Sequence, residues 1–158
     1  MAKRRGKHRP KRTILRVGVH LVWATKYRTP FLDTGIRARL FPYISGIVRH
    51  SGGHLLAGGG WRDHVHLYVE MPATISLAML VSTIKSNSMR WIRESFPEAQ
   101  AAGWQKGYAA FSVDRRHDDR LMSYIADQDR IHRQRTTESE RRALLRAHQV
   151  HPVFDPCD

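Results

Sequence analysis

The sequence is poor in cysteine and in long apolar segments. Cys157 is the only cysteine in 158 residues, so an intramolecular disulfide is impossible and the reducing cytoplasm is the expected compartment. No apolar run approaches the roughly 18 to 20 residues that a membrane-spanning helix needs. The basic N-terminus is not followed by the apolar segment of a signal peptide. These absences argue against membrane insertion and against a disulfide framework.

Acidic residues are absent from the first 32 positions, which contain ten Lys or Arg. The formal net charge of the whole chain is +13, so much of the excess lies in this segment. We interpret residues 1–12 as a disordered basic arm that neutralises phosphates and makes nucleic-acid binding salt-dependent. A solubilising tail or a ribosome-like RNA-binding arm is the alternative. The candidate phosphate contacts in the arm are Lys3, Arg4, Arg5, Lys7, Arg9, Lys11 and Arg12.

The apolar pattern predicts one α+β domain at residues 13–148, with a flexible tail at 149–158. It indicates a strand, a helix, two strands, a helix and a strand, which is the order of a ferredoxin-like antiparallel sheet. The C-terminal helices follow this sheet. The expected ranges are 13–26, 34–50, 54–57, a strand ending at 70, 75–96 and 108–113, with further helices from 118 and from 136 or 137 to 148.

The glycine triplet Gly58-Gly59-Gly60 lacks the features of a nucleotide-binding loop. No Gly-Lys-Thr or Gly-Lys-Ser sequence follows it, and no helix is expected to begin there. We therefore predict no nucleotide cofactor, and we interpret residues 58–63 as a hairpin between two strands.

His64 and His66 lie on one face of the predicted strand, while the apolar residues between and after them lie on the other. The apolar residues can then be buried and the imidazoles left free to bind a divalent metal. Glu70 shares the histidine face and could be an accessory ligand, although a surface ion pair fits it equally well. A His-x-His pair taken alone is more often structural than metal-binding.

Tyr124 and Gln128 are four residues apart in a predicted helix, so they share one face. Gln128 offers an amide oxygen that suits Mg²⁺ or Mn²⁺. Tyr124 could act as a nucleophile if a metal ion polarised the phosphodiester that it attacks. His132, two turns after Tyr124, is a possible accessory ligand or DNA contact. An ordinary helix surface explains these residues if they are considered alone. His20, in the middle of the first strand, is predicted as a core histidine.

At these positions the sequence resembles a known family. His64-Val65-His66 is similar to the HUH motif (histidine, hydrophobic, histidine) of enzymes that nick single-stranded DNA with a tyrosine. The resemblance is closest to the single-tyrosine transposases of minimal bacterial insertion sequences, the transposase A class. Segments that resemble this class occur in the expected order at residues 18–28, 63–72, 104–113 and 124–128, followed by His132.

The resemblance implies a metal-dependent DNA transposase. Tyr124 would attack single-stranded DNA and form a 5′-phosphotyrosine, with His64, His66 and Gln128 holding Mg²⁺ or Mn²⁺. It also implies a hairpin-bearing single-stranded DNA partner and a homodimer with composite active sites. We expect DNA contacts at Lys26, Arg28 and Lys85. The run Lys85-Ser86-Asn87-Ser88 departs from the family's Lys-Gly-x-Ser-Ser-like pattern.

Three alternatives remain open from the sequence. A domesticated relative would use the same chemistry as an endonuclease on genomic repeat hairpins. A non-catalytic single-stranded nucleic-acid-binding protein would need only the basic arm and the ferredoxin-like order. A metal-dependent nuclease would use water as the nucleophile and form no covalent protein adduct.

Overall fold

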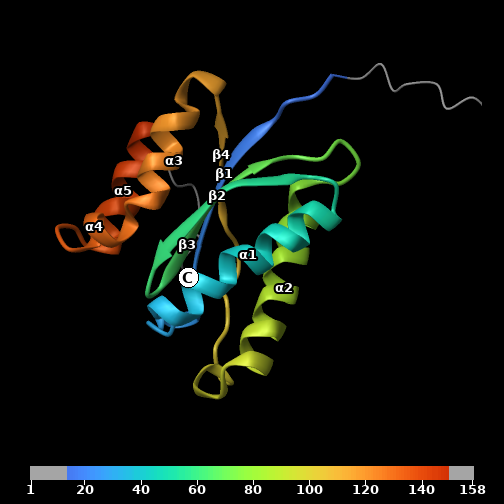
Figure 1. Cartoon of the computed structure of the whole chain (residues 1–158). Helices are drawn as coiled ribbons and strands as arrows, with labels where there is room; N and C mark the ends of the chain where they lie inside the picture. The colour runs from blue at the N-terminus through green and yellow to red at the C-terminus, as the bar shows by residue number, and fades with distance from the viewer. Residues whose placement is uncertain (1–13, 150–158) are drawn as a thin grey trace, which may run out of the picture.

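In the computed structural model, which describes residues 14–149, a four-stranded antiparallel sheet lies between two groups of helices (Figure 1). The order of the strands is β2-β3-β1-β4, which confirms the predicted ferredoxin-like arrangement. The strands are β1 (Gly18–Ala24), β2 (His54–Trp61), β3 (His64–Glu70) and β4 (Ala109–Val113). The helices are α1 (Thr34–His50), α2 (Leu77–Ser95), α3 (Asp118–Ala126), α4 (Gln128–His132) and α5 (Thr137–Ala147), with short 3-10 turns at Lys26–Arg28, Pro97–Ala99 and Arg115–His117.

The predicted basic arm at 1–12 and residues 150–158 of the predicted tail lie outside the described residues. None of the helices between residues 14 and 149 combines the length and the apolar character needed to cross a membrane.

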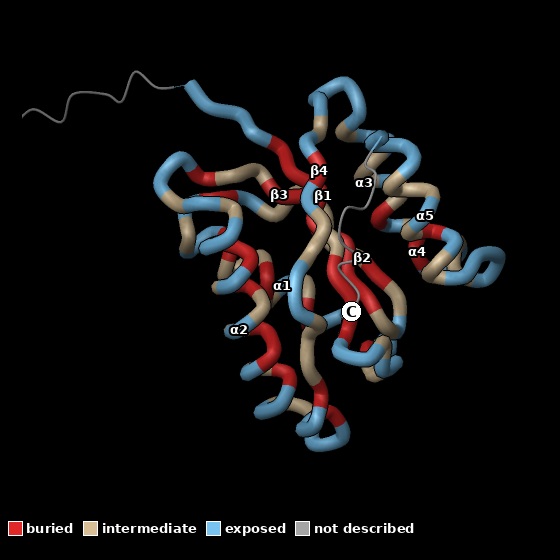
Figure 2. Tube along the Cα trace, turned by 180° about the vertical axis from the view of Figure 1, so that it is seen from behind, coloured by how far each residue is buried: buried red, intermediate tan, exposed pale blue. Residues whose placement is uncertain are grey.

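The apolar core lies between the sheet and the helices α1 and α2. Val65, Leu67 and Val69 of β3 are completely buried there, as the alternation of the strand predicts. Figure 2 shows buried segments along both helices where they face the sheet. The helices contribute Ile36, Leu40, Ile44, Val48, Leu80, Ile84 and Ile92 to this core. Packing on this face holds β3 in place, so the side chains on its other face are presented to α3, α4 and α5.

The glycine triplet lies inside β2, which corrects the predicted hairpin at 58–63. The strand continues to Trp61, and only the two residues before His64 form the turn. A Cβ atom at Gly58 would lie 2.7 Å from the ring of Phe41 in α1, and one at Gly59 would lie 2.2 Å from the carbonyl oxygen of Ile125 in α3. Glycine is needed here because helices approach β2 closely on both faces.

The predicted helix that carries Tyr124 and Gln128 is interrupted between them. Helix α3 ends at Ala126, and Asp127 adopts φ −87° and ψ 10° before α4 begins. The carbonyl of Asp127 accepts the amides of Arg130 and Ile131, which starts the new helix. Tyr124 and Gln128 therefore come together across a tight turn and not along one continuous helical face.

Candidate active site

His64 and His66 point from β3 toward the C-terminal helices and are buried. The C-terminal helices cover this face of the sheet (Figure 1), so the imidazoles face a buried cluster and not solvent. Asp63 Oδ1 lies 2.8 Å from His64 Nδ1, and His20 Nε2 lies 3.0 Å from His66 Nδ1. Since both Nδ1 atoms have partners, the Nε2 atoms are the ones available to a ligand. His20 is buried, as predicted, and its contact orients His66.

Glu140 of α5 completes this pair, and the sequence analysis did not identify it. Its Oε2 atom lies 3.3 Å from His64 Nε2, and its Oε1 atom lies 3.4 Å from His66 Nε2. The only available signal was a glutamate on the inward side of a short helix, one turn before Leu144. Such a residue is equally consistent with a solvated helix start.

The three side chains of His64, His66 and Glu140 could hold a metal ion. Their ligand atoms all lie within 4.8 Å of one another, and all three residues are buried. Among the described residues, His66 Nε2 has no hydrogen-bond partner although it is inaccessible to solvent. A buried nitrogen without a partner is costly, and a cation would satisfy it. A cavity of about 60 Å³ borders all three residues.

Tyr124, Gln128 and His132 join the same cluster. The Tyr124 hydroxyl donates a hydrogen bond to Glu140 Oε1, and Gln128 Nε2 donates to the same oxygen at 2.8 Å. Gln128 Oε1 lies 3.3 Å from His64 Nε2. His132 Nε2 lies 2.7 Å from Glu140 Oε2. All of these contacts occur within one chain, so Tyr124 lies beside its own histidine pair.

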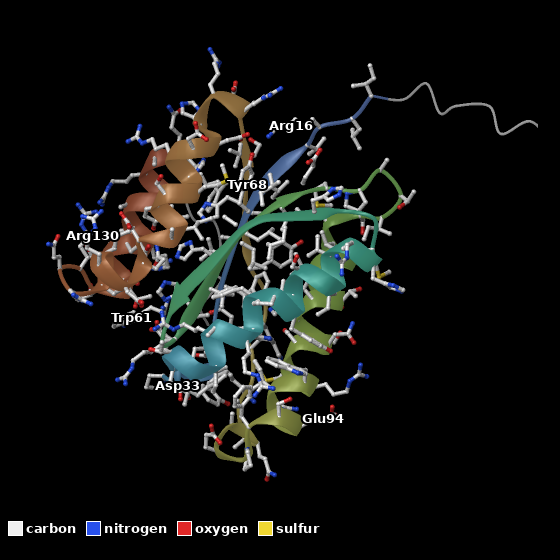
Figure 3. All side chains as sticks on the ribbon, in the orientation of Figure 1. Arg16, Asp33, Trp61, Tyr68, Glu94 and Arg130 are labelled. Atoms are coloured by element: carbon white, nitrogen blue, oxygen red, sulfur yellow. The ribbon has the colours of Figure 1, made fainter. Side chains whose placement is uncertain are left out.

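Three further contacts fix the surroundings of Tyr124. The Tyr68 hydroxyl of β3 donates to Asp118, the first residue of α3, at 2.5 Å, and Arg16 pairs with the same carboxylate (Figure 3). Trp61, at the end of β2, stacks on His132 with ring centroids 5.5 Å apart (Figure 3). The tyrosine helix is therefore anchored to the sheet at its N-terminal end, and the α4 segment is anchored beside it.

Glu70 lies away from the cluster. It is half-buried at the last position of β3, opposite Gly18 and His54. Six residues of extended chain separate it from His64, which corresponds to roughly 20 Å. Its predicted role as an accessory ligand has no support in this arrangement.

The charges of the histidines and of Glu140 depend on one another. Burial alone would lower the pKa of His64, but its hydrogen bonds to Asp63 and Glu140 outweigh burial and raise that pKa to about 9. Burial lowers the pKa of His66 to about 4 and that of His20 to about 3. Burial would raise the pKa of Glu140, but the close contacts of its carboxylate with the His64 and His66 imidazoles hold that pKa well below its usual range. Glu140 is therefore an anion at neutral pH.

Tyr124 is a neutral phenol in this arrangement. Burial raises its pKa above the ordinary value, and the hydrogen bond to Glu140 raises it further. The positive charge of Arg135 lowers the same pKa, but by less than burial raises it. The phenol oxygen is thus held in place by its hydrogen bond to Glu140.

The predicted cationic DNA contacts have different surroundings. Lys26 is exposed in the turn after β1, and Arg28 Nη1 lies 3.7 Å from Asp63 Oδ2, close to the histidine strand. Lys85 Nζ donates to the carbonyls of Gln105 and Gly107, both at 2.7 Å, so it holds the loop before β4. The seven predicted contacts in the arm lie outside the described residues.

The comparisons with known proteins agree with this geometry. Residues 13–128 match a family model described as "Transposase IS200 like". A candidate transposase from Deinococcus radiodurans has a similar solved structure, with a TM-score of 0.63 and 24% identity over 77% of this chain and 98% of that one.

A solved REP-associated tyrosine transposase bound to a REP hairpin is also similar, with a TM-score of 0.58 and 14% identity over 96% of this chain and 94% of that one. At these identities the two structures show a shared fold. No protein of curated function matches the sequence. Because the family model covers well over half of the residues, the chain belongs to the family of IS200-like transposases.

Proposed function

We propose that the protein cleaves and rejoins single-stranded DNA at insertion-sequence ends, with Tyr124 as the nucleophile. The observation that carries this proposal is the contact of one carboxylate, Glu140, with the Tyr124 hydroxyl and with both histidines of the pair. A nucleophile and a metal-binding cluster within hydrogen-bonding distance of each other are the minimum that tyrosine-dependent phosphoryl transfer requires.

The ligands proposed for a divalent ion are His64, His66 and Glu140, with the Gln128 amide oxygen as a further candidate. Imidazole, carboxylate and amide donors together suit Mg²⁺ or Mn²⁺. When bound, such an ion would polarise the scissile phosphate and offset the negative charge of the transition state. Asp63 and His20 orient the two imidazoles so that each presents Nε2.

In the proposed step, the Tyr124 oxygen leaves its contact with Glu140 and forms a bond to phosphorus. The bond from phosphorus to the 3′-oxygen breaks, and that oxygen leaves as a hydroxyl, so the phenol proton is accounted for. The product is a 5′-phosphotyrosine. Attack by another 3′-hydroxyl reverses the step and joins a new pair of strands without ATP, because the covalent link retains the energy of the phosphodiester.

The test is formation of an SDS-resistant protein–DNA adduct. Labelled single-stranded DNA spanning candidate element ends is incubated with the protein in Mn²⁺ or in EDTA and analysed on a denaturing gel. We expect an adduct that needs the metal and is lost in Tyr124→Phe. Tyr43→Phe is the matched control, because Tyr43 stacks on Trp91 on the opposite side of the sheet. Cleavage that persists in Tyr124→Phe would indicate a water-using nuclease, and binding without cleavage would indicate a binding module.

A repeat-hairpin endonuclease with the same chemistry is the second candidate. It is favoured by the similarity over 96% of this chain to a transposase solved with a REP hairpin. Oligonucleotides that carry a hairpin beside the cleavage site, compared with the same single strand without the hairpin, test this candidate. Faster adduct formation on repeat hairpins than on insertion-sequence ends would favour it over transposition.

The homodimer with composite sites remains a prediction from the family resemblance. The contacts of Tyr124 support a site completed within one chain. Mixing Tyr124→Phe with His66→Ala distinguishes the two arrangements, since activity returns in the mixture only if one chain supplies the tyrosine to the other's histidines. Recovery would support composite sites, and its absence would support a site completed within one chain.

A further inference from the structure

A cleft of about 870 Å³ opens beside Tyr124 and is bounded by β4, α3, α4 and α5. Tyr124 and Glu140 both line its wall. Whatever approaches the phenol oxygen from this side must therefore pass the other residues of the lining. The lining contains the arginines Arg120, Arg130 and Arg135 and the histidines His20, His117 and His148.

The acidic residues of the cleft do not neutralise these arginines, of which only Arg130 forms an ion pair among residues 14–149, with Asp127. Asp114 forms a bidentate ion pair with Arg116, and Glu140 is engaged by the histidine pair. The lining therefore carries an excess of positive charge. A concentration of one charge in a concave site attracts ligands of the opposite charge.

Arg120 and Arg135 differ from Arg130, the third arginine of the lining, whose Nη2 atom lies 2.5 Å from Asp127 Oδ2. Arg142, for comparison, donates to Glu138 at 2.8 Å. Within residues 14–149, no acidic side chain forms an ion pair with Arg120 or Arg135, and both residues are exposed. Their guanidinium donors have no acidic partner in this described part of the chain, and a guanidinium fork matches the geometry of a phosphate.

Both arginines are placed near the nucleophile. Arg120 precedes Tyr124 by four residues in α3, so the two side chains lie on the same side of the helix. Arg135 comes from the turn between α4 and α5 and lines the same cleft as Tyr124. Arg120 and Arg135, which come from two separate segments, therefore lie beside the path by which a ligand in the cleft reaches the Tyr124 oxygen.

We propose that this cleft binds the single-stranded DNA backbone next to the scissile bond, with Arg120 and Arg135 each contacting a phosphate. The proposal rests on the proposed function, because it assumes that Tyr124 attacks DNA. The volume lies within the range that encloses a drug-sized ligand, comparable to one or two nucleotides, and a duplex does not fit in it. The specificity of these contacts would be for a single strand and not for a base sequence.

Binding of a labelled single strand to the full-length chain over a range of salt concentrations is the first test. Arg120→Ala and Arg135→Ala should each weaken binding roughly tenfold. Each should also reduce the slope of log K against log[salt] by about 0.7, the value for one phosphate contact on a single strand. The matched control is Arg90→Ala, an exposed arginine of α2 on the opposite side of the sheet; it should leave the slope unchanged.

The second test places a neutral methylphosphonate at single positions beside the cleavage site. If an arginine contacts one of these phosphates, neutralising that phosphate slows adduct formation by the wild type but causes no further loss in the matching alanine variant. Because both arginines are exposed and form no ion pair with residues 14–149, their replacement should leave thermal stability unchanged.

The outcomes separate this inference from the proposed function. Normal adduct formation together with unchanged affinity and salt slope in both variants would overturn the cleft assignment and leave the tyrosine chemistry intact. The expected loss of slope in a protein that forms no adduct would support the cleft and reject the chemistry. Stronger competition by duplex DNA than by a single strand would also overturn the assignment.

Discussion

Replacing Gly59 with alanine should displace Tyr124, the proposed nucleophile, although Gly59 does not contact Tyr124 itself. The added Cβ atom would lie 2.2 Å from the carbonyl oxygen of Ile125 and 2.9 Å from Ile125 Cγ2. Carbon–oxygen contacts are normally about 3.3 Å or longer, so α3 or β2 must move by roughly 1 Å. Ile125 is the neighbour of Tyr124, and the displacement is therefore transmitted to the phenol.

The magnitude follows from these distances. A shift of ~1 Å in reacting groups can cost about 100-fold in rate, and overpacking costs roughly 1 to 3 kcal/mol of stability. We therefore expect Gly59→Ala to fold, to unfold at a lower temperature, and to form the DNA adduct about 100-fold more slowly. The rate of adduct formation under single-turnover conditions, corrected for the folded fraction, is the measurement.

Two glycine variants provide the controls. A Cβ atom at Gly58 would lie 2.7 Å from Phe41 on the α1 side, so Gly58→Ala should lower stability but leave the adduct rate of the folded protein close to wild type. A Cβ atom at Gly46 in α1 would meet nothing within 4 Å, so alanine there should raise the free energy of unfolding by roughly 1 kcal/mol. Equal adduct rates in Gly58→Ala and Gly59→Ala would refute the reasoning.

Three other predictions concern the cluster. Glu140→Gln should weaken Mn²⁺ binding at least about tenfold, as measured by calorimetry. Glu138→Gln, on the same helix, should leave the Mn²⁺ affinity unchanged. Equal Mn²⁺ affinities of the two variants would exclude Glu140 as a ligand. In EDTA, stability should be greatest near pH 6.5. Below that pH the unfolded chain protonates His20 and His66. The folded chain does not, because the pKa values of these residues are about 3 and 4 in the folded state. Stability therefore falls by up to about 1.4 kcal/mol per pH unit for each imidazole. Above pH 6.5, the stability contributed by protonated His64 is lost as pH rises through about 9. Denaturant unfolding at several pH values measures how the free energy of unfolding changes on both sides of the maximum. A free energy of unfolding that does not change with pH would contradict these pKa shifts. Finally, Mn²⁺ should bind more tightly at pH 9 than at pH 7, because His64 must lose its proton to bind; affinity independent of pH would show that His64 is not a ligand.

The local pattern of the chain was enough to predict the sheet and part of the site. Alternation in β3 separates Val65 and Leu67 from His64 and His66, and this depends only on the geometry of an extended strand. The resemblance around His64, His66 and Tyr124 predicted that they act together, and the fold brings them into one cluster. Gln128 also joins this cluster, although a turn at Asp127 places it there.

The tertiary structure decided what no local pattern could show. Glu140 reaches the histidines only because α5 folds back over the sheet, and His20 meets His66 only because of the register between β1 and β3. The role of Gly59 depends equally on a helix more than sixty residues later. Contacts between distant segments depend on register and helix packing, whereas strand alternation and helix caps depend on neighbours in sequence. For this reason the sequence by itself determined the elements and the motif residues, and the packing of the C-terminal helices determined the complete site.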